Sequence, residues 1–179
     1  SKTLTLQSSA GAEYSRLSQS GAGGLTRQFV RPKGQVSLAW RPSPRTDLSL
    51  KVERAVGQLN FYDFAASGNI SAGTTNAGNA NLVPPQSWNI ELQGTRNLGV
   101  WGTTTLRAYG RRFSDIVDVI PIGATGQAPG NLDSATVIGA QWTSTINFDP
   151  LGWKGAKLDA DIILQRSRLK DPLTGEHRE

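Results

Sequence analysis

The chain has 179 residues, of which 20 are glycine and none is cysteine or methionine, and its formal net charge is +5. The lack of cysteine excludes disulfides and thiolate metal sites, and no apolar run approaches the roughly 18 residues of a membrane-spanning helix. Because the lysines and arginines are scattered singly and accompany no binding motif, we also expect no nucleic-acid partner.

The first predicted strand runs from Thr3 to Leu17. Polar residues alternate there with the apolar positions Leu4, Leu6, Ala10, Ala12 and Tyr14. Successive side chains of a strand point to opposite faces, so this pattern predicts a strand with one apolar and one polar face. The Gly- and Ser-rich segment from Ser18 to Arg27 is predicted to be a loop.

The clearest alternation runs from Arg31 to Val56 and predicts a hairpin with its turn at Pro42 to Thr46. One face is polar and charged, with Lys33, Gln35, Ser37, Ser49, Lys51 and Glu53. The other face is apolar, with Val36, Leu38, Trp40, Leu48, Leu50 and Val52.

A long connection rich in Gly, Asn, Ala and Ser follows from Gly57 to Pro85. Its candidate ligand-binding residues, which offer hydrogen bonds and ring stacking, are Asn60, Phe61, Tyr62 and Phe64. The alternative interpretation is that these aromatic side chains merely fold the connection onto the rim of the sheet.

Four further strands are predicted after this connection. They are Gln86 to Gly94, Thr104 to Arg111 with an extended continuation from Ser114 to Ile122, Ala135 to Phe148, and Lys157 to Leu169. Short turns are predicted at Arg96 to Gly102 and at Asp149 to Ala156, and a longer loop at Gly123 to Ser134.

The loop lengths and the tryptophans indicate a transmembrane β-barrel. Short links alternate with long ones, as in up-and-down barrels with short periplasmic turns and long extracellular loops. Trp40, Trp101 and Trp153 lie at the short turns, whereas Trp88 and Tyr14 lie near the opposite rim, as aromatic belts do. The alternative is a soluble sheet with a tryptophan packed beneath each hairpin.

The charges follow the two faces. Within strands they occupy the polar face, and exceptions such as Arg16, Arg54 and Arg96 lie at strand ends, where a long side chain can extend to headgroups. We therefore predict an all-β, antiparallel up-and-down meander of about seven long strands, part of a transmembrane β-barrel. Its apolar face should contact lipid and its polar face an aqueous lumen.

We expect neither catalysis nor a cofactor or metal site. The single histidine, His177, is expected to be a solvated loop residue, and one histidine cannot build a multi-histidine metal site. Asp159 and Asp161 share a polar face and have the spacing of an acid/base pair, but we interpret them as solvated charges. Asp115 and Asp118 are interpreted as charges at the base of a loop.

Two segments carry a family pattern. Residues 131–141 resemble the motif N-x-x-x-A-x-x-x-G-x-E, with Gln141 in place of Glu. A second segment is similar to the motif G-N-P-x-L-x-P-E-x-S. It reads Gly78-Asn79-Ala80-Asn81-Leu82-Val83-Pro84-Pro85-Gln86-Ser87, with Ala80 in place of Pro and Pro85 in place of Glu. Both patterns, together with Gln165 to Arg168 and Asp171 to Glu176, resemble the barrel of TonB-dependent outer-membrane receptors.

This resemblance implies a barrel of about 22 strands in the outer membrane of a Gram-negative cell, plugged by an N-terminal domain. The implied partners are outer-membrane lipid, the TonB energy-transducing complex acting through the plug, and a small-molecule nutrient such as a siderophore, cobalamin or a carbohydrate. Residues 1–179 correspond to part of the barrel domain, so we expect a fragment without plug and terminal strands that self-associates when isolated. The alternative is a soluble or surface-exposed antiparallel β module for binding or adhesion.

Overall fold

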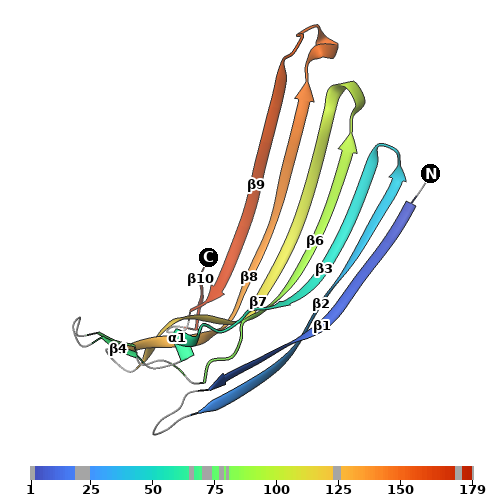
Figure 1. The fold of residues 1–179 in the computed structure, drawn as a ribbon. Helices are drawn as coiled ribbons and strands as arrows, with labels where there is room; N and C mark the ends of the chain where they lie inside the picture. The colour runs from blue at the N-terminus through green and yellow to red at the C-terminus, as the bar shows by residue number, and fades with distance from the viewer. Residues whose placement is uncertain are drawn as a thin grey trace.

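The computed structural model describes residues 3–18, 25–64, 67–69, 74–76, 79, 81–122, 126–171 and 175–178. Its main feature, shown in Figure 1, is one antiparallel sheet with seven long strands: β1 (Thr3–Ser18), β2 (Thr26–Ser43), β3 (Thr46–Val56), β6 (Gln86–Asn97), β7 (Gly102–Ile122), β8 (Gly126–Asn147) and β9 (Lys157–Lys170). The shorter elements are α1 (Phe61–Phe64), β4 (Ser67–Asn69), β5 (Thr74–Asn76), η1 (Gly99–Trp101), η2 (Asp149–Leu151) and β10 (His177–Arg178). Within the described ranges, no helix has the length and apolarity to span a membrane.

The sheet is a meander, because each long strand pairs with the next long strand along the chain. Pro44 and Arg45 make the turn between β2 and β3, and the other two short connections contain η1 and η2. These three connections lie at one end of the sheet, and α1 and β4 lie at the other end (Figure 1). The predicted antiparallel meander of seven long strands is confirmed.

The strand register aligns the apolar positions of all seven long strands. Cross-strand partners lie side by side on one face, so each chain of partners forms a row across the sheet. One row consists of Leu6, Leu38, Leu50, Leu92, Ala108, Ala140 and Leu164. The next apolar row toward the short turns consists of Leu4, Trp40, Leu48, Gly94, Leu106, Trp142 and Ile162.

Trp142 is a further aromatic side chain near the short turns. Sequence analysis did not assign it to that group. It shares a row with Trp40, and its Nε1 donates to Thr104 Oγ1 on β7 at 2.8 Å. A half-exposed indole that hydrogen-bonds at one edge is the arrangement expected at an interface between hydrocarbon and water. The sequence lacked this information because Trp142 is not adjacent to a turn.

The described part of the chain does not cover its own apolar face. Val36, Ile90 and Leu158 are 49%, 51% and 48% exposed, and Leu50 is also exposed. The buried apolar side chains among the described residues are few and come from the half of the molecule away from the short turns: Phe29, Leu82, Pro84, Ala128 and Leu132. An apolar face of this extent requires an external apolar partner.

The structure corrects one boundary. Sequence analysis predicted a loop from Gly123 to Ser134, but β8 begins at Gly126 and pairs with β7 out to Ile122. The prediction of a long link after the fifth strand is therefore wrong. Gly and Pro suggested a loop, whereas the extended segment after Ser114 supplies a pairing partner and Ala128 and Leu132 become buried. The extended continuation from Ser114 to Ile122 is confirmed.

Some predicted features lie outside the described residues. These are most of the loop from Ser18 to Arg27 and parts of two motif segments, Gly78 with Ala80 and Pro172 to Thr174. The side chains of Phe64 and His177 are also outside, although the backbone of His177 pairs with Lys170 in β10.

Leu50 and Lys51 are adjacent residues on opposite faces and so test which face contacts hydrocarbon. In the intact barrel protein, Leu50→Arg should prevent barrel assembly, because a lipid-facing arginine at mid-bilayer costs about 2–4 kcal/mol. Lys51→Leu should be tolerated, since the Lys51–Glu53 ion pair it removes, 3.1 Å long and solvent-accessible, is worth about 1 kcal/mol at most. Heat-modifiable gel migration measures assembly, and equal behaviour of the two variants would reverse the face assignment.

Candidate functional site

The connection between β3 and β6 is pinned at its base. The N–H of Gly57 donates to the carbonyl oxygen of Pro85 at 2.7 Å, which closes residues 57–85 into a loop. Beside this contact, Gln58 Nε2 donates to Glu13 Oε1 on β1 at 3.1 Å, and Glu13 Oε2 accepts from Lys33 Nζ on β2 at 2.5 Å. The loop base is therefore held by the first two strands as well as by β3 and β6.

The Glu13 anchor persists in mildly acidic solution. The hydrogen bond from Lys33, followed by the one from Gln58, lowers the pKa of the Glu13 carboxyl below its ordinary value. With a lowered pKa, the carboxylate contributes stability above the ordinary pKa and loses that contribution as the pH falls through the lowered one. Glu13 lies beyond the apolar rows, at the level of the loop base.

The predicted ligand-binding residues lie on a single helical turn, α1, that sequence analysis did not anticipate. Asn60 caps this helix, because its Oδ1 accepts the N–H of Tyr62 at 3.1 Å. Phe61 and Tyr62 are 51% and 71% exposed, and their rings meet edge to face with centroids 6.5 Å apart. The structure thus brings Asn60, Phe61 and Tyr62 together and uses the Asn60 side-chain oxygen as a cap.

Asn79 ties this helix to the extended β7–β8 hairpin. Its N–H donates to the carbonyl oxygen of Asp63, the third residue of α1, at 2.8 Å. Its Nδ2 donates to the carbonyl oxygen of Pro129 on β8 at 3.0 Å. The two exposed rings are therefore carried on a segment that is anchored to a neighbouring hairpin.

Asn131 on β8 fastens the end of the same loop. Its Nδ2 donates to the carbonyl oxygens of Val83 and Asp115, at 2.9 and 2.7 Å, and its Oδ1 accepts the N–H of Val83 at 2.9 Å. Leu82, the residue before Val83, is fully buried. One amide side chain therefore satisfies three backbone groups and holds the loop against β7 and β8.

Asp115 connects this clamp to the sheet. Its φ of 57° lies in the left-handed region, which Asp tolerates better than most residues with a side chain. Its Oδ2 accepts from Gln86 Nε2 at 3.1 Å and from Arg31 Nη1 at 3.4 Å. Sequence analysis recognised a charge at a loop base but not these partners, since Arg31 and Asp115 are 84 positions apart.

Arg107 links three strands on the polar face. Its Nη2 donates to Glu91 Oε2 on β6 at 2.5 Å, and its Nη1 donates to Gln141 Oε1 on β8 at 3.5 Å. Gln141 Nε2 donates in turn to Asp161 Oδ1 on β9 at 2.9 Å. This chain of polar contacts joins neighbouring strands through their side chains as well as through their backbones.

Tyr109 extends these contacts across a glycine. The guanidinium groups of Arg107 and Arg111 lie over its ring, 5.0 and 5.4 Å from the centroid, and its hydroxyl donates to Gln165 Oε1 on β9 at 2.8 Å. Gly139 on β8 makes this possible, because a Cβ there would lie 2.6 Å from the Tyr109 ring and hydroxyl. The tyrosine thus crosses β8 at a residue without a side chain.

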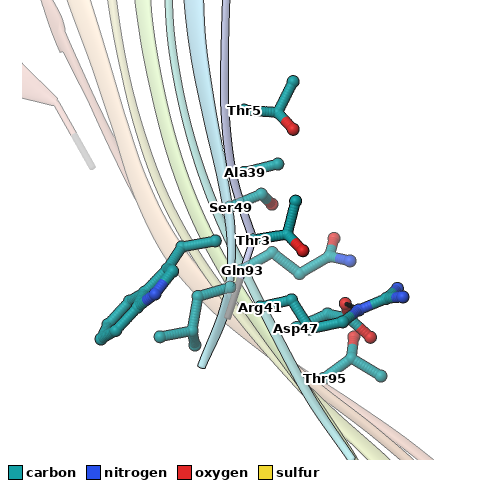
Figure 2. Close-up of a pocket in the computed structure, with 10 residues that line it drawn as sticks. Thr3, Thr5, Ala39, Arg41, Asp47, Ser49, Gln93 and Thr95 are labelled. Carbon is teal, nitrogen blue, oxygen red and sulfur yellow. Dashed lines mark hydrogen bonds and ion pairs between the residues drawn. The ribbon is translucent and has the colours of Figure 1, made fainter. Parts of the chain in front are cut away.

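Several shallow hollows mark the polar face of the described residues, and two of them lie at different levels along the strands. The first, of about 350 Å³, lies toward the short turns, and its labelled side chains project from the same side of the sheet (Figure 2). There Arg41 Nε donates to Asp47 Oδ1 at 2.5 Å. The second, of about 360 Å³, lies toward the loop and is lined by residues including Lys51, Glu53, Asn89, Glu91, Tyr109 and Arg111. Hydroxyl, amide and charged groups thus cover this face, as predicted. The register also places Arg112 and Arg166 on the apolar face inside β7 and β9, so the prediction that charges within strands keep to the polar face is wrong at these two positions.

Asp159 and Asp161 on β9 bind side chains of the neighbouring strand β8. Thr145 Oγ1 donates to Asp159 Oδ1 at 2.6 Å, so each carboxylate accepts a hydrogen bond from a side chain of β8. Within the described ranges, no group of three His, Asp or Glu side chains is placed to hold a metal ion. These two carboxylates therefore reinforce the pairing of β8 with β9.

Asn131→Ala should loosen the loop clamp. The substitution leaves three backbone groups without their partner, which should destabilise the loop region by about 1–3 kcal/mol and speed proteolysis within residues 57–85. Asn147→Ala is the matched control, because it lies at the other end of β8 and makes one longer contact, 3.3 Å to the Val100 carbonyl oxygen. Equal protease sensitivity of the two variants would contradict the clamp.

Gly139→Ala should displace Tyr109 and destabilise the sheet by about 1–3 kcal/mol, because the new methyl would also lie 2.9 Å from the Leu164 carbonyl oxygen. Denaturant unfolding measures the change, with Gly11→Ala on β1 as control, since nothing lies within 4 Å of its added Cβ. In a Tyr109→Ala background the cost of Gly139→Ala should fall. An undiminished cost there would show that Tyr109 is not the group displaced.

Comparison with known proteins agrees with this geometry. A family model described as TonB dependent receptor-like, beta-barrel, matches residues 3–172 and so includes all seven long strands. No curated protein matches the chain. The family consists of receptors and transporters of the Gram-negative outer membrane and is not an enzyme family. The chain, with its apolar and polar faces and its anchored loop, belongs to the β-barrel family of TonB-dependent receptors.

Proposed function

We propose that this chain is one arc of a complete receptor barrel that imports a nutrient across the outer membrane. The proposal rests on one observation, the register of the sheet. It aligns the seven long strands so that their apolar side chains lie on one uncovered face. Hydrocarbon is the environment that suits such a face, and water or a polar domain suits the other.

The two edges of the sheet indicate where the remaining strands of the barrel would pair. Among the described residues, β1 has no partner on its outer edge, and β9 pairs with two residues of β10. We infer that further strands pair with both edges to close a barrel of about 22 strands. A plug domain would then contact the polar face, and the TonB complex would act through that plug. An isolated arc would self-associate through its edges and its apolar face.

We assign nutrient capture to the loop that carries Asn60, Phe61, Tyr62 and Phe64. Short turns face the periplasm in such barrels, so α1 at the opposite end faces the exterior. The contacts of Asn79 and Asn131 present the Phe61 and Tyr62 rings on an anchored segment, which reduces the ordering cost of binding. Such a ring pair suits an iron–siderophore chelate, cobalamin, a carbohydrate or a similar nutrient.

The combined variant Phe61→Ala with Tyr62→Ala, made in the intact receptor, tests this assignment. Titration calorimetry with an iron–siderophore chelate, cobalamin and an oligosaccharide first identifies which probe the wild type binds. The variant should bind that probe about tenfold more weakly or worse, since each ring contact is worth about 1 kcal/mol. Val100→Ala is the control, because Val100 is also 71% exposed but lies at the short-turn end.

Unchanged affinity in the double variant would remove the loop from the binding site. It would leave the barrel assignment standing, because heat-modifiable migration reports barrel assembly separately from ligand affinity.

A further inference from the structure

The connections at the end of the sheet where α1 lies contain almost no charge. The chain has 19 lysines and arginines, yet none of them falls within residues 18–25, within the capture loop 57–85, or within the distal part of the β7–β8 hairpin, residues 116–132. The charged residues of these three segments are two carboxylates, Asp63 on α1 and Asp118 on β7. Positive charge is therefore absent from the segments that connect the strands at this end.

The cations on the neighbouring strands already have partners. Arg27, near the start of β2, lies over the Phe29 ring and donates to Asn81 Oδ1 at 3.3 Å. Three others form ion pairs of 2.5, 3.4 and 2.7 Å, respectively Lys33 with Glu13, Arg31 with Asp115 and Lys170 with Asp133. An anionic ligand at the loop would have to displace a carboxylate before it could pair with one of these three cations.

The other arginines toward this end point elsewhere. Arg54, Arg112 and Arg168 share a row on the apolar face, and Arg111 lies over the Tyr109 ring, one row deeper on the polar face than Lys33. The two exposed rings of α1 therefore stand in a region where the nearest fixed charge along the chain is the negative charge of Asp63.

Neutral hydrogen-bonding groups are abundant in the same loop. Residues 57–85 include five asparagines, and the paired strands β4 and β5 read Ser-Gly-Asn and Thr-Thr-Asn. β4 lies at the same end of the sheet as α1 (Figure 1). Amide and hydroxyl groups both donate and accept hydrogen bonds, so this composition suits a ligand that presents many hydroxyl groups.

The rings of Phe61 and Tyr62 present two separate faces. Their planes are inclined at 69° with centroids 6.5 Å apart, so each face has the size of a single ring. The slightly positive C–H groups of a sugar ring can lie on the electron-rich face of an aromatic ring. Successive rings of a sugar chain can use separate faces, whereas the wide corrin ring of cobalamin needs one continuous surface.

We propose that the capture loop takes a neutral oligosaccharide and that Asp63 and Asp118 disfavour anionic ligands. Asp63 directly follows Tyr62, and its backbone carbonyl oxygen rather than its carboxylate holds Asn79. Asp118 precedes Val119, the partner of Pro129, whose carbonyl oxygen accepts from the Asn79 side chain. Both carboxylates thus belong to the segments that Asn79 joins, and repulsion by them adds to the selectivity that stacking provides. The inference rests on the assignment of nutrient capture to this loop in the proposed function.

Ligands that differ in charge alone test this inference in the intact receptor. A printed array of neutral oligosaccharides first finds a chain that the wild type retains. Titration calorimetry then compares this chain with its uronic-acid counterpart, in which a carboxylate replaces a hydroxymethyl group. The uronate should bind about fivefold more weakly at low ionic strength, because two like charges about 4 Å apart in water repel by about that factor.

Substitution of the two carboxylates should change this preference. Asp63→Asn should lower the ratio of the two affinities, and the double variant Asp63→Asn with Asp118→Asn should abolish it. Asp159→Asn is the matched control, because it removes one negative charge at the short-turn end and should keep the wild-type ratio. Added salt should also reduce the ratio, since it screens the carboxylates from the uronate. Heat-modifiable migration of each variant first confirms that its barrel has assembled.

Several outcomes would overturn the proposal. These are failure to retain any neutral oligosaccharide, tighter binding of the uronate than of the neutral chain, and an unchanged ratio in the double carboxylate variant. Displacement of the neutral chain by an equal concentration of a ferric tris-catecholate would overturn it in favour of an anionic chelate, and displacement by cyanocobalamin in favour of a corrin.

The ring variant separates a wrong ligand class from a wrong site. If the wild type binds a chelate or a corrin and Phe61→Ala with Tyr62→Ala loses it, capture by the loop stands and the neutral oligosaccharide is overturned. If the double ring variant binds the identified ligand as the wild type does, the assignment of capture to the loop has failed, and this inference fails with it.

Discussion

The structure depends on strand register. A shift of one residue between any two strands would move a whole set of apolar side chains to the polar face, because side chains alternate with a period of two. Here a single row joins Leu6 on β1 to Leu164 on β9 through five intermediate strands without a break in alternation. One face of the sheet consequently stays uncovered among the described residues, while the backbone groups between neighbouring long strands remain paired.

Side chains on the polar face reinforce this register. Arg107 and Tyr109 on β7 make contacts that extend from β6 to β9, and Gly139 gives the tyrosine the space to cross β8. At the loop end, Asn131 and Asp115 hold the chain that returns from α1 to β6. The sheet and its loop are thereby one connected unit, so that rings on α1 have a defined position relative to the wall.

Much of the fold could be predicted because its signals are local. Alternation over Arg31 to Val56 and the turns before Thr46 and Lys157 depend on residues adjacent in the chain, and the structure confirms them. The loop predicted at Gly123 to Ser134 was wrong because pairing with β7 and burial of Leu132 outweigh the turn preference of glycine and proline. The candidate ring residues were named from composition, but the helical turn that groups them, capped by Asn60, was not foreseen.

The sequence by itself determined the two faces and the number of long strands, since polarity with a period of two and the spacing of turn residues are carried by the chain alone. Its motif segments, such as residues 131–141, indicated the family by resemblance. Tertiary structure decided which residues meet: Arg31 with Asp115, Asn131 with Val83, Trp142 with the row of Trp40, and Arg54 with Trp88. These placements follow from register and loop return. Both arise from contacts between residues far apart in the chain, and the polarity of a single residue does not specify its distant partner.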